Sequence, residues 1–138
     1  SRKAEPGEEP EEELGEGEED VIERLCDRMQ RAEFQPPNLE ELESEVGLSH
    51  DRVEALMELL VDRDKIHHVG AGVFLSESSM ARAREAVRSN CEANGELDIP
   101  TLRDQLGTTR KFLIPLLEHF DSTGLTVRAG ANRVLKRR

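Results

Sequence analysis

The sequence has 138 residues, the size of one domain or two small ones, with a charged fraction of 36% and a formal net charge of -11. It has no Trp or Tyr and four Phe, which argues against an aromatic base-stacking sheet of the RRM kind. No apolar run reaches the ~18 residues of a transmembrane helix. The two cysteines, Cys26 and Cys91, form no CxxC pair and argue against a zinc ribbon or a disulfide scaffold.

The N-terminal segment is predicted to be a disordered acidic linker over residues 1–19. The first 20 residues hold ten acidic and two basic residues and a single Leu. Such a composition cannot bury enough apolar surface to offset the entropy lost on ordering. The alternative is an acidic tail that occupies a basic site while nucleic acid is absent. Because the chain begins with Ser1, we expect it to be part of a longer protein.

The remainder of the chain is an internal repeat with a constant offset of 60 residues. The same pattern of apolar and turn residues occurs twice, without a gap. Its first copy is Leu39, Leu42, Val46, Gly47, Ser49, Val53, Leu56 and Leu60. Its second copy is Ile99, Leu102, Leu106, Gly107, Thr109, Leu113, Leu116 and Phe120. A single unit of about 60 residues is only marginally stable, so two units packed together are physically reasonable.

Each repeat predicts three helices followed by a hairpin. Apolar residues at helical spacing mark a first helix over 21–29 and again over 83–91. Second helices over 39–46 and 100–106 end at Gly47 and Gly107, and Ser49 and Thr109 cap the third helices. Hairpins follow over 65–75 and 125–136. The cysteines lie on or beside the first-helix stripes, and we interpret them as small buried apolar residues.

Helices joined by a short turn and followed by a hairpin are typical of a winged helix. The predicted fold is therefore mainly α with small β-hairpins, arranged as two tandem winged-helix domains. The first covers residues 20–78 and the second covers residues 79–138, with a short linker near Ser76 to Met80.

No catalytic constellation stands out. The GxxxxGK[ST], HExxH and GxSxG motifs are absent. His67 and His68 are neighbours on a predicted strand and point to opposite faces, so they are poorly placed to share a metal ion. We expect a monomeric, cytoplasmic binding module rather than an enzyme, with no membrane contact, metal or cofactor in this chain.

The two units differ in charge at the start of the third helix. The first opens on His50, Asp51 and Arg52, whereas the second opens on Arg110 and Lys111 with no acid. Residues 99–138 hold eight basic and three acidic residues. Three of the basic residues, Arg128, Arg133 and Lys136, lie in the second hairpin. We expect a basic helix head and a basic hairpin edge to flank one surface that binds phosphates. An ordinary solvated basic face is the alternative.

Two apolar residues of the third helix of the second unit, Phe112 and Pro115, need a separate interpretation. Phe112 lies four residues before Leu116, and we favour a place in the core over stacking on an extruded base. Pro115 falls inside the helix, where it lacks an N–H and frees the carbonyl of Lys111.

The stretch from Leu102 to Asp121, followed by Gly124 to Arg128, Gly130 and Arg133 to Leu135, resembles the extreme C-terminus of the SelB family of bacterial selenocysteine-specific elongation factors. The resemblance is dense over residues 97–135, and Pro115 is part of it. It is weaker over residues 21–75, where it depends mainly on the repeat. The family is a translation GTPase with winged-helix domains at its C-terminus, and this chain looks like the last two.

The resemblance implies that the second unit binds an mRNA hairpin, the selenocysteine insertion element downstream of a UGA codon. Such binding would tether the factor and its selenocysteinyl-tRNA to the ribosome. GTP and Mg would belong to the full-length protein. By this resemblance, the RNA phosphates would be held at the helix head by Thr109, Arg110 and Lys111. The loop bases or the RNA backbone would be contacted around the wing by Arg128, Asn132, Arg133 and Lys136. Gln105 is a weaker candidate. Some members have an Asp after the wing glycine, where this chain has Ala131.

Two other classes remain open, a tandem winged-helix DNA-binding regulator and a protein-interaction module. A DNA reader needs base-reading side chains beyond the first turn of its recognition helix, but Leu113, Ile114 and Pro115 follow Lys111. The acidic first unit fits a protein-interaction module better than the second unit does.

Overall fold

The computed structural model describes residues 16–137 of the chain. Most of the segment predicted to be a disordered linker lies outside the described residues. The boundary needs correction, because the first helix, α1 (Glu16–Ala32), begins four residues before residue 20. Residues 16–19 therefore form its first turn.

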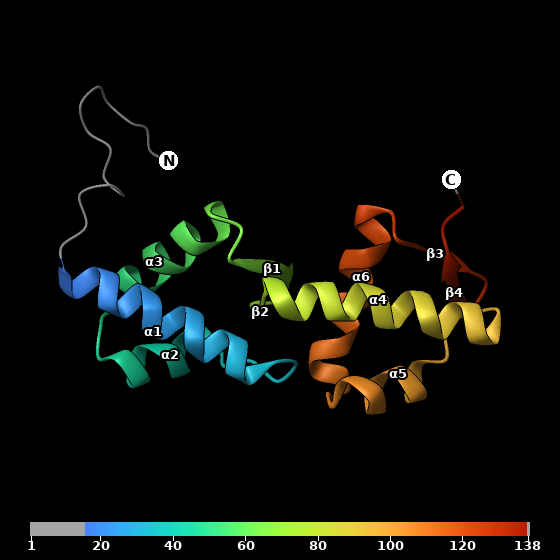
Figure 1. The fold of residues 1–138 in the computed structure, drawn as a ribbon, viewed down its shortest axis with the longest axis horizontal. Coiled ribbons are helices and arrows are strands. Elements are labelled where there is room, and N and C mark those ends of the chain that lie inside the picture. The colour runs from blue at the N-terminus through green and yellow to red at the C-terminus, as the bar shows by residue number, and fades with distance from the viewer. Residues whose placement is uncertain (1–15, 138) are drawn as a thin grey trace, which may run out of the picture.

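The fold is mainly helical with two small antiparallel hairpins, and the same order of elements occurs twice. Unit one, residues 16–76, consists of α1, α2 (Leu39–Val46), α3 (His50–Asp62), β1 (Ile66–Gly70) and β2 (Val73–Ser76). Unit two, residues 77–137, consists of α4 (Glu77–Asn94), α5 (Ile99–Leu106), α6 (Arg110–Thr123), β3 (Thr126–Ala129) and β4 (Asn132–Leu135). Figure 1 shows the units side by side along the long axis, with β1 and β2 between them and β3 and β4 at the far end.

The predicted helix ends are largely confirmed. Gly47 and Gly107 adopt the left-handed backbone at the ends of α2 and α5, with φ of 72° and 68°. Ser49 caps α3, where its side chain accepts a hydrogen bond from the amide of Arg52. Thr109 stands at the cap position of α6 with an extended backbone, but its side chain makes no capping hydrogen bond.

The short linker predicted near Ser76 to Met80 is wrong. Ser76 is the last residue of β2 and also caps α4, accepting a hydrogen bond from the amide of Ser79 at 3.1 Å. Both serines are buried, and Met80 is buried as well. The chain therefore passes from strand to helix without an intervening loop.

The hydrophobic core of unit two extends into unit one. Phe34, which follows α1, is only 2% exposed and packs in the same cluster as Leu113 and Leu117 of α6. Val69 and Leu75 of the β1–β2 hairpin join this cluster. The hydroxyl of Thr108 donates to the Phe34 carbonyl at 2.6 Å, and the side-chain amide of Gln35 donates to the Gly107 carbonyl at 2.8 Å. Unit two is thus packed directly on unit one.

The two cysteines behave as small apolar residues, as interpreted from the sequence. Cys91 is buried and Cys26 is half-buried against the core of unit one, and both are free thiols. Burial raises the pKa of each thiol. Within residues 16–137, no helix is both long enough and apolar enough to cross a membrane.

Candidate nucleic-acid interface

The head of α6 presents two exposed cations. Arg110 and Lys111 are exposed in the first turn, directly after Thr109. Within the described part of the chain, neither side chain has a carboxylate within 4.0 Å. The first turn of a helix also directs free amide N–H groups outward, so side-chain and backbone donors favour an anion at the same place.

The corresponding head of α3 in unit one is neutralised by its own neighbours. His50 Nδ1 lies 2.5 Å from Glu43 Oε2, and this hydrogen bond is the main reason that the pKa of His50 is raised. Arg52 pairs with Glu18 of α1. A phosphate would therefore meet a charge-balanced surface at α3 and an unpaired basic surface at α6.

The helix head and the wing tip lie at opposite ends of α5. Gly107, at the end of α5, leads into α6, whereas Ala131 and Asn132 of the wing tip line a crevice with Asp98 and Pro100 at the start of α5. Eight helical residues span roughly 12 Å. Gln105 is exposed near the end of α5, between these two regions. The structure therefore separates the two predicted parts of the surface by the length of α5.

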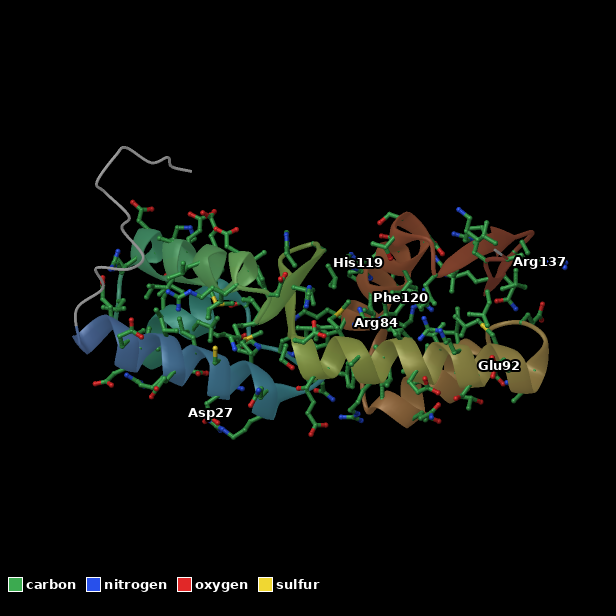
Figure 2. All side chains as sticks on the ribbon, turned by 45° about the horizontal axis from the view of Figure 1, so that its top comes forward. Asp27, Arg84, Glu92, His119, Phe120 and Arg137 are labelled. Carbon is green, nitrogen blue, oxygen red and sulfur yellow. The ribbon has the colours of Figure 1, made fainter. Side chains whose placement is uncertain are left out.

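The wing supplies further exposed cations. Arg128, Lys136 and Arg137 are exposed, and Asn132 is half-buried, with its side-chain oxygen accepting from the amide of Arg133 at 2.9 Å. Figure 2 places Arg137 at the end of the molecule remote from Asp27 of α1. The basic wing therefore projects away from the acidic unit one.

The prediction that Arg133 lies on an exposed basic edge of the hairpin is wrong, because Arg133 is buried. Its side chain is only 7% exposed, and its Nε lies 3.0 Å and 3.2 Å from the two carboxylate oxygens of Asp121. The Thr126 hydroxyl donates to the same carboxylate at 2.7 Å. Arg133 pairs across the hairpin with exposed Arg128, while Val127 on the opposite face is 43% exposed. Asp121 holds the arginine inward, so reading a loop base would require this ion pair to open.

Phe112 takes the place favoured from the sequence. It is half-buried and packs against the core of unit two, with the Lys111 ammonium 5.2 Å from its ring centroid. Pro115 is buried inside α6. With Leu113 also buried, little of this helix beyond its first turn could read the edge of a base.

The structure also brings forward residues that the sequence did not indicate. Arg28 and Gln35 of unit one line a crevice together with Lys111 and Phe112 of α6. Neither they nor Asp121 belong to a recognisable motif. Their roles depend on how the two units pack and on the hairpin register, and neither is encoded in local spacing.

Comparison with known proteins identifies one family. Residues 89–135 match the family model described as the winged helix of elongation factor SelB. A selenocysteine-specific elongation factor of Desulfomicrobium baculatum is 31% identical over 108 residues. That alignment covers 78% of this chain and 17% of the relative, so the chain spans about a sixth of that protein.

Solved structures of the same family share the fold. One is the mRNA-binding domain of elongation factor SelB from E. coli in complex with SECIS RNA, with a TM-score of 0.76 and 20% identity over 90% of this chain and 100% of that one. Another is a bacterial selenocysteine-specific elongation factor, with a TM-score of 0.64 and 25% identity over 95% of this chain and 20% of that one. Residues 89–135 are therefore a winged helix of the SelB family of selenocysteine-specific elongation factors, and the chain shares the fold of the SelB mRNA-binding domain.

Proposed function

We propose that this chain is the mRNA-hairpin-binding part of a selenocysteine-specific elongation factor. Its target would be the selenocysteine insertion element downstream of a UGA codon, and binding would tether the factor to the ribosome decoding that codon. The observation that carries the proposal is the exposed pair Arg110 and Lys111, which lies within the SelB-type winged helix and has no carboxylate within 4.0 Å in the described residues.

The chemistry of RNA favours this kind of surface. An A-form helix hides its bases in a deep, narrow groove, so proteins hold its phosphates and read bases in loops and bulges. A small basic helix head can grip the backbone while exposed wing residues, Arg128, Asn132 and Lys136, meet the loop. Duplex DNA is a less suitable target, because Leu113, Pro115, Leu116 and Leu117 face the core, and the next exposed residue after the first turn of α6 is the acidic Glu118.

The domain organisation is part of the proposal. Unit one, residues 16–76, and unit two, residues 77–137, would be tandem winged-helix domains, and the second one would bind the RNA. The chain itself would act as a monomeric cytoplasmic binding module without catalytic activity or cofactor. GTP, Mg, selenocysteinyl-tRNA and the ribosome would be bound through the full-length protein.

A titration tests the proposal directly. The chain is mixed with a selenocysteine insertion hairpin, a hairpin with scrambled loop and bulge, and duplex DNA of equal length, at fixed salt concentration. We expect the insertion hairpin to bind more tightly than both controls. Equal affinity for all three nucleic acids would show that the surface is a non-specific basic patch. Tighter binding of duplex DNA would favour the alternative of a DNA-binding winged-helix regulator.

A further inference from the structure

A cavity of about 310 Å³ opens between the two units, next to the head of α6. One wall comes from unit one, with Arg28 of α1, residues 35–38 and the tip of the β1–β2 hairpin. The other wall is Lys111 and Phe112. A volume of this size lies at the lower end of the range for small-ligand pockets.

The two walls present cations from different units. The Arg28 guanidinium is bound to Glu45 through Nε at 2.8 Å and Nη2 at 3.2 Å. These two bonds leave three of the five guanidinium N–H donors free. Lys111 has no carboxylate within 4.0 Å among residues 16–137, and its ammonium lies 5.2 Å from the centroid of the Phe112 ring.

The remaining lining is a mixture of polar and apolar groups. Gln35 is held in place because its amide donates to the Gly107 carbonyl, which leaves its side-chain oxygen as an acceptor. Pro36 and Pro37 are buried, and Phe112 is half-buried. Glu41 is the acidic member, and its carboxylate already accepts the amide of Asn38 at 2.8 Å in a capping box.

We propose that this cavity takes one nucleotide of the RNA held by α6, with its phosphate reached by Lys111 from one side and Arg28 from the other. Its ribose or base would contact Phe112 and the proline loop. Unit one then contributes directly to RNA binding, although its own third helix is charge-balanced. This inference rests on the proposed function and extends its site across the junction between the units.

The central experiment compares Arg28→Ala with Arg31→Ala in the full chain. Arg31 lies on the same helix, is 65% exposed and, among residues 16–137, pairs only with Asp27 of its own helix, so it is a matched control outside the cavity. With the insertion hairpin as probe, Arg28→Ala should weaken binding about tenfold, as expected for the loss of a hydrogen bond from a charged group. Arg31→Ala should stay within about twofold of the unaltered chain.

Glu45→Ala separates a ligand contact from a structural role. Arg28→Ala and Glu45→Ala remove the same ion pair, so their thermal unfolding should shift alike. Their affinities should differ, because Glu45→Ala keeps the guanidinium and removes a negative charge, and should bind as tightly as the unaltered chain or more tightly. Glu41→Gln keeps an acceptor for the Asn38 amide and should also tighten binding.

Three results would overturn the inference. Arg28→Ala could bind as Arg31→Ala does, or Glu45→Ala could lose as much affinity as Arg28→Ala, which would make the pair purely structural. In both cases the hairpin would still bind the unaltered chain, so the proposed function would stand. Failure of the unaltered chain to bind the hairpin would remove both together.

Discussion

The ion pair between Arg133 and Asp121 attaches the β3–β4 hairpin to α6. Removing Arg133 takes away the charged partner of the partly buried Asp121 carboxylate, which then keeps only the hydrogen bond from the Thr126 hydroxyl among the described side chains. We expect Arg133→Ala to lower the free energy of unfolding by on the order of 2 kcal/mol. Arg128→Ala, its exposed cross-strand neighbour, should change it little. Urea unfolding of both variants measures the difference.

The same pair gives an expectation for specificity. Because Arg133 acts through the position of the wing, Arg133→Ala should weaken all hairpins by a similar factor, whichever loop base is altered. Titrations against hairpins changed one loop base at a time provide the check. A change in base preference with unaltered unfolding would instead show that the arginine leaves Asp121 and contacts the RNA.

Arg110 and Lys111 should act mainly through phosphates. Each variant, Arg110→Ala or Lys111→Ala, should reduce the magnitude of the slope of log K against log salt by about 0.7 to 0.9, alike for good and poor hairpins. Titrations at several salt concentrations give this slope, and Arg31→Ala serves as the reference. Unchanged slopes would mean that the α6 head does not lie on the RNA backbone.

At the scale of elements, α6 meets the β1–β2 hairpin through a group of titratable side chains. Figure 2 shows His119 on α6 near Arg84 of α4. Burial lowers the pKa of His119, and the nearby positive charges of His67, Arg84 and His68 lower it further. A histidine whose pKa is depressed on folding stabilises the protein above its unfolded pKa of about 6.5 and loses this contribution as the pH falls below that value.

The variant His119→Gln tests this contact. We expect its stability to fall less steeply than that of the unaltered chain between pH 7 and pH 5, because its side chain does not bind a proton in the unfolded state. Urea unfolding across this pH range compares the two. His50→Gln provides a contrast, since the pKa of His50 is raised and its contribution is lost as the pH rises. Parallel curves for His119→Gln and the unaltered chain would contradict the assignment.

The elements were predictable because their signals are local. Leu39–Val46 follows directly from apolar spacing and the glycine that ends it, and the structure adds a capping box at Asn38. The face of the second wing was not predictable, because Val127 and Arg133 exchange the positions that polarity suggests. Arg133 is buried because Asp121, 12 positions earlier in the chain, gives its guanidinium a partly buried partner. The interface residues on unit one also depend on packing between distant segments.

At the scale of the whole molecule, Phe34 packs the end of α1 into the hydrophobic core of unit two. Phe34→Ala should cost about 3 kcal/mol, because it empties a site in the core of unit two that is 2% exposed. We expect the unaltered chain to unfold in one urea transition and the variant to unfold earlier, with Phe34→Leu intermediate. Two separate transitions in the unaltered chain would show that the units fold independently.

The direct passage from β2 into α4 also determines how the chain responds to proteases. Cleavage needs several exposed, extended residues that can enter an enzyme's cleft, and domain boundaries usually provide them. Here the boundary consists of a buried strand end and a capped helix turn, with Ser76, Ser79 and Met80 almost fully covered. A broad-specificity protease should therefore spare the junction, so that limited digestion leaves one resistant fragment containing both units.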